Sequence, residues 1–282
     1  MTTVDLSLQG AVLARLQDGT RIEPHLSPRP YLHPVRTTGG TVVTEESPGD
    51  HRHHVGVSAA VPDVSGVSFW GGTTFTRDRG PVLLDNHGRQ SHVSWTVREP
   101  DHHVEVLSWT GPGGDELLRE ERTTRALPLD ERTWVLDLRV RLTNTSGRDL
   151  SVGSPATNGR PGAGYGGLFW RAPISPTPPT CTGAGGLDGE KALHGSRAPW
   201  LAMAGSTADG APWTLVLLQP GPRTDPWFLR AEEYPGVGPA LAWDTRLPVP
   251  EGATLERRLR TAVHDGHTTG PGDLARRALD LA

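Results

Sequence analysis

Three histidines fall within four residues in the segment Asp50-His51-Arg52-His53-His54-Val55-Gly56. An imidazole is the common side chain that gains or loses a proton near neutral pH, and it is also a frequent metal ligand. Three imidazoles beside a carboxylate therefore indicate a chemical site. Proton transfer and metal binding are the two kinds of chemistry that such a segment supports.

In the acid–base interpretation, His53 or His54 donates or removes a proton, and a carboxylate such as Glu121 is its counterpart. Asp50 would fix the tautomer of a neighbouring histidine or would only cap a turn. A structural alternative stays open, in which the histidines hydrogen-bond to the loop backbone.

In the metal interpretation, His51 and His53 form a His-x-His pair, and a distant residue such as His33 or Glu121 completes a tetrahedral site. The cofactor is unknown from the sequence, and a divalent metal is the one candidate that these residue types suggest. A His-x-His pair is a weak signal by itself, because such pairs are common in proteins without a metal.

Arginine forks bind carboxylates or vicinal hydroxyls, and tryptophan faces stack on sugar rings or cations. Three tryptophans at loop boundaries beside Gly, Arg or Pro are expected to lie near a ligand: Trp70, Trp170 and Trp227. The residues expected to bind substrate are Arg36, Trp70, Tyr165, Arg171, Arg223 and Trp227. A looser set of histidines is interpreted as solvated: His87, His92, His102 and His103. The sequence has no dinucleotide fingerprint, phosphate loop or Gly-x-Ser-x-Gly elbow.

The elements that position these residues are predicted to be strands. Apolar and polar residues alternate most clearly over residues 133–144, as in a half-buried antiparallel strand. The 35 glycines and 26 prolines argue against long helices, and only residues 273–281 predict one. Further strands are predicted at 4–8, 11–16, 41–44, 55–61, 67–70, 91–98, 104–110, 116–126, 211–218 and 254–263. We expect a single all-β domain over residues 1–282, a large antiparallel β-sandwich with a short C-terminal helix.

Composition excludes several partners. The net charge of −4 and the lack of a basic patch argue against nucleic acid. No apolar run approaches the roughly 18 residues of a membrane span, so no membrane partner is expected. The single cysteine, Cys181, and the absence of a basic start followed by an apolar core favour a cytoplasmic location. Sheet edges of a large sandwich often pair, which leaves a homodimer open.

Two motifs near the N-terminus, at 29–36 and 50–56, resemble the opening of the bacterial PmoA-like family, which is labelled methane oxygenase but is functionally obscure. The segments 164–171 and 221–228 are similar to its later motifs. The resemblance implies carbohydrate chemistry and a galactose-mutarotase-like sandwich, whose late catalytic glutamate has only Glu232 and Glu233 as candidates here. It also implicates specific residues: His33, Arg36, His51, His53, His54, Glu121, Tyr165, Arg171, Arg223 and Trp227.

The hypothesis that follows is an enzyme acting on a sugar or modified glycoside, of hydrolase, lyase or epimerase type, by histidine and carboxylate acid–base catalysis. Its partner would be a small carbohydrate. One alternative is a metal-dependent oxidoreductase or hydrolase that uses the histidine segment. The other is a non-catalytic sugar-binding module.

Overall fold

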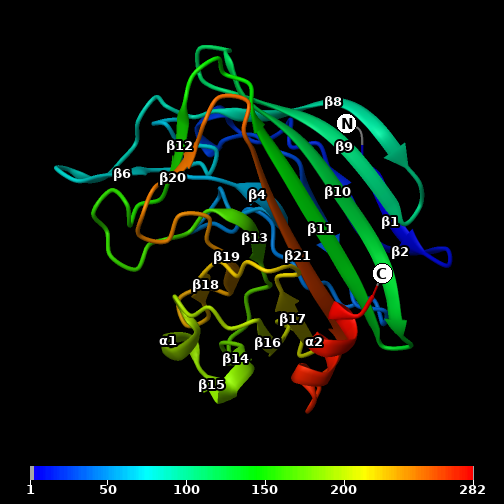
Figure 1. Cartoon of the computed structure of the whole chain (residues 1–282). Helices are drawn as coiled ribbons and strands as arrows, with labels where there is room; N and C mark the ends of the chain where they lie inside the picture. The colour runs from blue at the N-terminus through cyan, green and yellow to red at the C-terminus, as the bar shows by residue number, and fades with distance from the viewer. Residues whose placement is uncertain (1–2, 282) are drawn as a thin grey trace.

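A computed structural model describes residues 3–281 and shows two large antiparallel sheets with a short C-terminal helix (Figure 1). The expected all-β class is therefore confirmed. The larger sheet has nine strands in the order β15 (Leu187–Asp188), β14 (Thr180–Gly183), β16 (Trp200–Ser206), β17 (Pro212–Leu218), β21 (Thr254–Asp265), β11 (Thr133–Asn144), β10 (Glu116–Asp130), β9 (His102–Thr110) and β8 (Arg89–Arg98).

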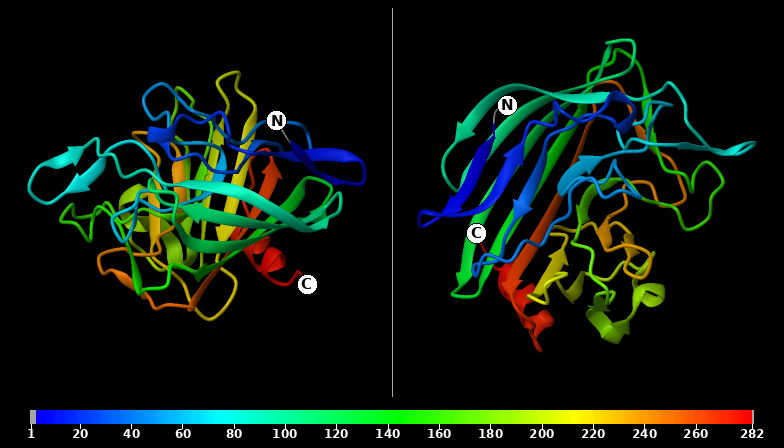
Figure 2. Two further views of the ribbon diagram at one scale, coloured as in Figure 1. Left: turned by 90° about the horizontal axis from the view of Figure 1, so that it is seen from above. Right: turned by 180° about the vertical axis from the view of Figure 1, so that it is seen from behind.

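The second sheet lies across the concave side of the first, as the view from behind shows (Figure 2). It has seven strands in the order β1 (Val4–Leu8), β2 (Ala11–Gln17), β3 (Tyr31–Val35), β4 (Val57–Ala60), β13 (Gly167–Arg171), β19 (Gly236–Pro239) and β18 (Trp227–Arg230). Smaller elements are β20 (Leu247–Val249), β12 (Leu150–Gly153), β5 (Asp63–Val64), β6 (Thr74–Thr76), β7 (Gly80–Val82), α1 (Glu190–Leu193) and the 3-10 turns η1 (Pro24–Leu26) and η2 (Ala184–Gly186).

The space between the sheets is filled by one hydrophobic cluster that draws residues from Val4 to Val263. In β11 the predicted alternation holds, because Trp134, Leu136 and Leu138 all enter this core. Burial of large apolar side chains at roughly 25 cal/mol per Å² is the main force that holds such sheets together. The core thus fixes which face of each strand points inward.

The strands predicted at 41–44 and 67–70 are wrong, because side-chain hydroxyls there accept backbone N–H groups that would otherwise pair with a neighbouring strand. At 41–44 the hydroxyl of Thr44 accepts the backbone N–H of Val35, and only Val42 forms an isolated bridge. At 67–70 the Ser68 hydroxyl accepts the N–H of Trp70, and the chain then turns. Local hydrogen bonds of Ser and Thr compete with sheet pairing in this way.

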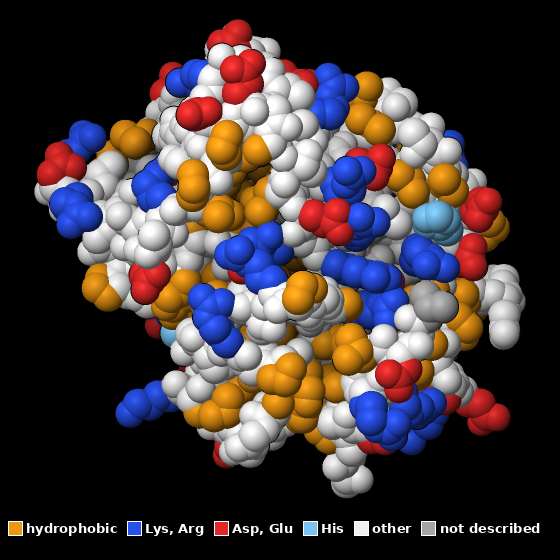
Figure 3. Space-filling model, viewed as in Figure 1, with side chains coloured by type: hydrophobic (Ala, Val, Ile, Leu, Met, Phe, Trp, Pro, Cys, Tyr) orange, Lys and Arg blue, Asp and Glu red, His pale blue; other side chains and the backbone are white. Residues whose placement is uncertain are grey.

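The outer face of the nine-stranded sheet carries both a helix and charges. Helix α2 (Pro271–Leu279) packs Leu274, Ala275 and Ala278 on β17 and β21, beside the lower end of the sheet in Figure 1. Elsewhere Lys and Arg side chains gather over this face (Figure 3). No helix within residues 3–281 has the length and apolar character needed to cross a membrane.

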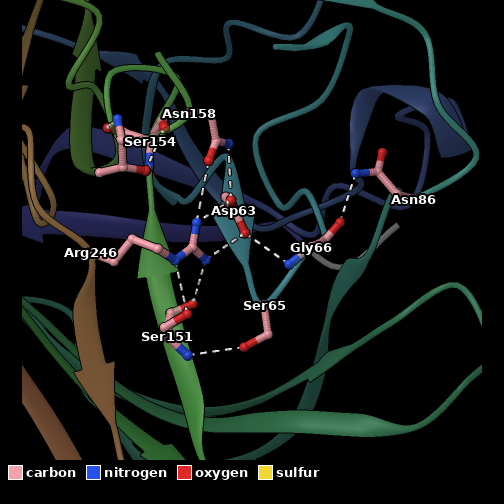
Figure 4. A network of polar contacts seen from close by, with 9 residues as sticks. Asp63, Ser65, Gly66, Asn86, Ser151, Ser154, Asn158 and Arg246 are labelled. Atoms are coloured by element: carbon pink, nitrogen blue, oxygen red, sulfur yellow. Dashed lines mark hydrogen bonds and ion pairs between the residues drawn. The ribbon is translucent and has the colours of Figure 1, made fainter. Parts of the chain in front are cut away.

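The long loop after β12 is tied down by an ion pair (Figure 4). Arg246 donates from its two terminal nitrogens to both oxygens of Asp63, at 2.7 and 3.1 Å. Asn158 donates to the same carboxylate at 3.1 Å, and Arg246 also reaches the Ser151 hydroxyl. A bidentate guanidinium–carboxylate pair fixes geometry as well as charge, so this loop is held against the small sheet.

Candidate functional site

The two N-terminal sequence motifs meet in space through Arg29. This side chain is almost completely buried, and it donates to the backbone carbonyls of His53 at 2.6 Å and Trp70 at 3.1 Å. It also donates to the carbonyls of Leu26 and Ser27. The histidine segment lies in the loop before β4 and forms no strand, so the guanidinium of Arg29 fixes its backbone in place of strand pairing.

The three imidazoles of this segment, His51, His53 and His54, form a stack that we call the histidine cluster. His51 lies parallel to His54 with ring centroids 4.7 Å apart, and His53 meets the edge of His54 at 4.6 Å. Trp70 closes the inner side at 5.6 Å from His54. The sequence prediction that these residues act together is consistent with this packing.

Asp50 and His51 form the accessible part of the cluster. The Nδ1 atom of His51 lies 2.8 Å from the Asp50 carboxylate, and both side chains are partly exposed. A carboxylate accepts hydrogen bonds, so Nδ1 carries the proton and Nε2 presents a lone pair. This arrangement orients His51 as a proton acceptor.

His54 is buried, His53 is partly buried, and both rings are electrically neutral. Burial, together with the charge of Arg29, lowers the pKa of His53 to about 3. Burial and the neighbouring imidazoles hold the pKa of His54 well below its usual value, and its Nδ1 has no hydrogen-bond partner. Desolvation disfavours the imidazolium form, so neither ring donates a proton at neutral pH. A neutral imidazole still accepts a proton, so the predicted acid–base role of His53 and His54 stays a prediction.

A buried arginine without partners lies below the cluster. Arg171 ends β13 and is fully buried, yet none of its three guanidinium nitrogens has a hydrogen-bond partner. Its guanidinium lies 4.8 Å from the centre of the Tyr234 ring, and that ring lies 4.7 Å from His51. Buried polar groups are nearly always paired, so a free guanidinium marks a place where an anion fits.

An aromatic wall completes the site. Tyr165 lies 4.6 Å from Trp70, and Phe169 lies 5.0 Å from Trp70 and 5.1 Å from His54. Burial raises the pKa of Tyr165 to about 12 and raises that of Tyr234 further, so both phenols keep their protons. Trp70 therefore lies against the histidines, with Tyr165 packed on it. Trp170, which was also expected near a ligand, is fully buried, and its indole N–H donates to the Val43 carbonyl at 2.8 Å.

The metal-ligand set His33, His51 and His53 is not assembled. Within residues 3–281, no three His, Cys, Asp or Glu side chains are grouped so that they could hold a metal ion. His33 instead lies 2.9 Å from the Thr44 hydroxyl and 3.7 Å from Glu46. The His-x-His spacing brings the rings of His51 and His53 to a centroid distance of 5.9 Å.

Glu121 and Arg223 belong to the outer face of the nine-stranded sheet and not to the histidine cluster. Glu121 is about half exposed and accepts a hydrogen bond from Arg141 at 3.3 Å. Arg223 is 57% exposed and pairs with Asp225. Neighbouring strand residues point to opposite faces, so it is Glu120 that faces the interior.

Arg36 and Trp227 are also placed elsewhere. Arg36 donates to the carbonyl of Gly40 in its own turn. Trp227 is a core residue, with no exposed surface and its indole nitrogen donating to the Ala198 carbonyl at 2.7 Å. Neither side chain approaches the cluster in any contact described above. Their expected substrate-binding roles are therefore corrected.

Sequence reasoning missed Tyr234 and the role of Arg29. Tyr234 is one of only three tyrosines in the chain and directly follows Glu232 and Glu233, which are both exposed. The small number of tyrosines was the one sequence feature that could have drawn attention to Tyr234. Its position against Arg171 follows from pairing of β13 with β19, in which Arg171 opposes Gly236.

The fold and the cluster together define an antiparallel β-sandwich protein with a histidine, arginine and tyrosine site on loops at one sheet. The chain belongs to a family described as a family of unknown function, DUF6807, which matches residues 3–278. The resemblance to PmoA-like proteins and to a mutarotase-like sandwich stays a prediction beside this finding. No curated protein matches the sequence.

Among solved structures, the chain is similar to a heparan sulfate lyase HepC mutant from Pedobacter heparinus, with 10% identity and a TM-score of 0.35. The match covers 91% of this chain and 34% of that one, so the chain spans about a third of the length of the lyase. A likeness of this size carries no argument about activity.

Proposed function

We propose that the histidine cluster, with Asp50, Arg171 and Tyr234, is the active site of a carbohydrate-active enzyme that moves a proton on an acidic sugar. The observation that carries this proposal is the buried guanidinium of Arg171, whose three nitrogens lack partners beneath the Asp50–His51 pair. A carboxylate is the natural partner of a guanidinium fork, and uronic acids are the sugars that bear one.

His51 is the proton acceptor in this proposal. Its Nε2 lone pair removes the hydrogen from the carbon next to the sugar carboxylate, and Asp50 stabilises the imidazolium that results. Arg171 stabilises the negative charge that develops on the carboxylate oxygens, as preorganised donors do in a site that excludes water. The proton removed stays on His51 at this stage.

Tyr234 supplies the second proton. Its phenol remains protonated because burial raises its pKa, and the ring lies between His51 and Arg171. Returning a proton to the opposite face of the carbon gives an epimerase. Protonating a leaving oxygen on the next carbon breaks the glycosidic bond and leaves a double bond conjugated with the carboxylate, which is the lyase outcome.

Substrate entry needs a small movement. Tyr234 covers the guanidinium of Arg171, and it belongs to the segment 231–235, which forms no strand. Loops of this kind move on faster timescales than sheets and often open and close over active sites. The sugar carboxylate would take the place of the tyrosine ring face on Arg171.

The test is hydrogen exchange at the acidic carbon. Galacturonate and glucuronate oligosaccharides are incubated with the protein in deuterated water, and deuterium incorporation is followed by NMR together with ultraviolet absorbance for the lyase product. We expect the wild-type protein to catalyse exchange, the folded His51→Ala variant to lose it, and the exposed control His267→Ala to keep it. Full exchange in folded His51→Ala, or none in the wild type with any uronide, refutes the proposal. Uronide binding without exchange would instead support a binding module.

A further inference from the structure

A cavity lies between residues 18–28 and strands β8 and β9. Its volume is about 650 Å³, within the usual size range of small-molecule sites of roughly 300–1,000 Å³. Leu16, Ile22 and Pro28 give it apolar walls, and none of the histidine-cluster residues lines it. We call it the β8–β9 cavity.

A buried carboxylate faces this cavity with one free oxygen. The Oε1 atom of Glu105 lies 2.8 Å from Nδ1 of His92, whereas Oε2 is buried and has no hydrogen-bond partner. The Glu105 side chain is only 5% exposed. Because buried polar atoms are nearly always paired, the free oxygen points to a hydrogen-bond donor supplied by a ligand.

The cation nearest to Glu105 along the sheet is already committed. Arg122 stands opposite Glu105 in the β9–β10 register, but it donates to both oxygens of Glu120 at 2.6 and 2.9 Å. Its remaining donors reach the Pro30 carbonyl and the Gln90 side-chain oxygen. Arg122 therefore does not satisfy the free oxygen of Glu105.

A tryptophan is turned into the same cavity by a break in the strand register. β8 carries an extra residue between His92 and Ser94, so Trp95 stands opposite the inward-facing Glu105. In a regular register, with Val93 paired to Val106, Trp95 would oppose Val104 and point outward. β-bulges are known to re-aim side chains in this way, and Trp95 keeps part of its ring surface exposed.

The cavity lining carries two carboxylates, Asp18 and Glu105, and one guanidinium, Arg89, so its charged groups do not favour an anion. An anion would meet Glu105, with Glu120 close behind it on the same inner face. Burial raises the pKa of Glu105 even though Arg122 and His92 oppose the rise, so the site disfavours additional negative charge. A neutral ring with hydroxyl groups fits both the apolar walls and the free acceptor.

We propose that the β8–β9 cavity binds a neutral sugar ring, which packs its C–H face on Trp95 and donates a hydroxyl hydrogen to Oε2 of Glu105. His92 holds the other carboxylate oxygen and provides a further polar edge. His92 is exposed, as expected, although it also pairs with Glu105. His103 was expected to be solvated as well, but it is buried in β9. This binding site stands independently of the proposed uronide chemistry.

The test uses methyl glucoside and methyl galactoside as probes, with methyl glucuronide as the charged comparison, and binding is followed by tryptophan fluorescence and ligand-observed NMR. We expect at least one of the two neutral glycosides to bind. Trp95→Ala removes a stacking contact and Glu105→Gln removes a charged hydrogen bond, so each should raise Kd about tenfold or more. The glucuronide should bind more weakly at this cavity.

Val93→Ala is the matched control, because Val93 lies in the same strand, is exposed and does not line the cavity. It should bind like the wild type, and so should His51→Ala, which separates this cavity from the histidine cluster. No binding of either neutral glycoside, or undiminished binding in folded Trp95→Ala, overturns the proposal. If Glu105→Gln fails to fold, the partly exposed Trp95→Ala decides alone.

Discussion

Replacing Arg171 with methionine should stabilise the protein. The guanidinium is fully buried and makes no hydrogen bond, and a buried polar group without a partner costs about 1–3 kcal/mol. Its guanidinium packs on the Tyr234 ring at 4.8 Å, a cation–π contact that contributes about 0.5–2 kcal/mol, and the carboxylates of Asp50 and Glu45 also favour its charge. Methionine fills similar space without charge, so we expect a net gain on the order of 1 kcal/mol in the free energy of unfolding.

Arg29→Met is the matched comparison, since Arg29 is equally buried and belongs to the same site. Its side chain donates to four backbone carbonyls and to the Ser58 hydroxyl. Removing it leaves those acceptors unpaired, which should cost about 3–5 kcal/mol. Two substitutions of one residue type, at equal burial, should therefore shift stability in opposite directions.

The assay is urea unfolding of both variants and the wild type, with the midpoint compared at an unchanged m-value. A higher midpoint for Arg171→Met and a lower one for Arg29→Met would show that Arg171 is retained at a cost to stability, as functional residues often are. If Arg171→Met loses as much stability as Arg29→Met, the guanidinium has structural partners and the argument for an anion site fails.

Three further outcomes are expected. Tyr234→Phe keeps the ring over Arg171 and removes only the proton donor, so kcat on a uronide should fall roughly 10²–10⁴-fold with little change in KM, and steady-state kinetics would show it. The pKa of His53 is about 3 in the folded protein and about 6.5 in the unfolded chain, so the unfolded state binds more protons between these two values. The contribution of His53 to the free energy of unfolding is therefore complete above pH ~6.5 and declines as the pH falls, by up to ~1.4 kcal/mol per pH unit. His53→Gln should flatten that slope in urea titrations at a series of pH values, and an unchanged slope would contradict the assignment. Arg246→Met should lower the free energy of unfolding by about 1–3 kcal/mol through the orphaned Asp63 carboxylate, whereas Asp63→Asn combined with it should cost less than the sum of the single changes.

Strand identity was readable from the sequence where the period-2 pattern was strong, as in β11. The same alternation also shows which charged residues of a strand face the interior, which residue type alone does not show. In β10, Glu120 and Arg122 share the parity of buried Leu118, so they face inward and Glu121 faces outward. A carboxylate on the inward, apolar face of a strand is a better candidate for a functional group than one on the outward face.

Other features depended on contacts between distant segments. Trp227 stands beside Arg and Pro, which suggested a ligand wall, but its indole partner is the carbonyl of Ala198, 29 residues earlier. Likewise, Arg29 and the histidine segment are joined through backbone carbonyls that carry no sequence signature. Residue types indicated that the three histidines lie together because these residues are adjacent in the chain, and their rings do pack on one another.

The interrupted register of β8 also governs how this protein meets other chains. β8 is the edge of the nine-stranded sheet, and its pairing with β9 is irregular at two places, after His92 and after Trp95. A broken edge offers no continuous row of N–H and C=O groups to an incoming strand, which protects against aggregation by sheet extension. Deleting Val93 would remove the first irregularity and leave Ser94 and Trp95 opposite Val106 and Glu105, so it would smooth the edge without turning Trp95. The device that shapes a cavity therefore also keeps the sheet from growing beyond its own last strand.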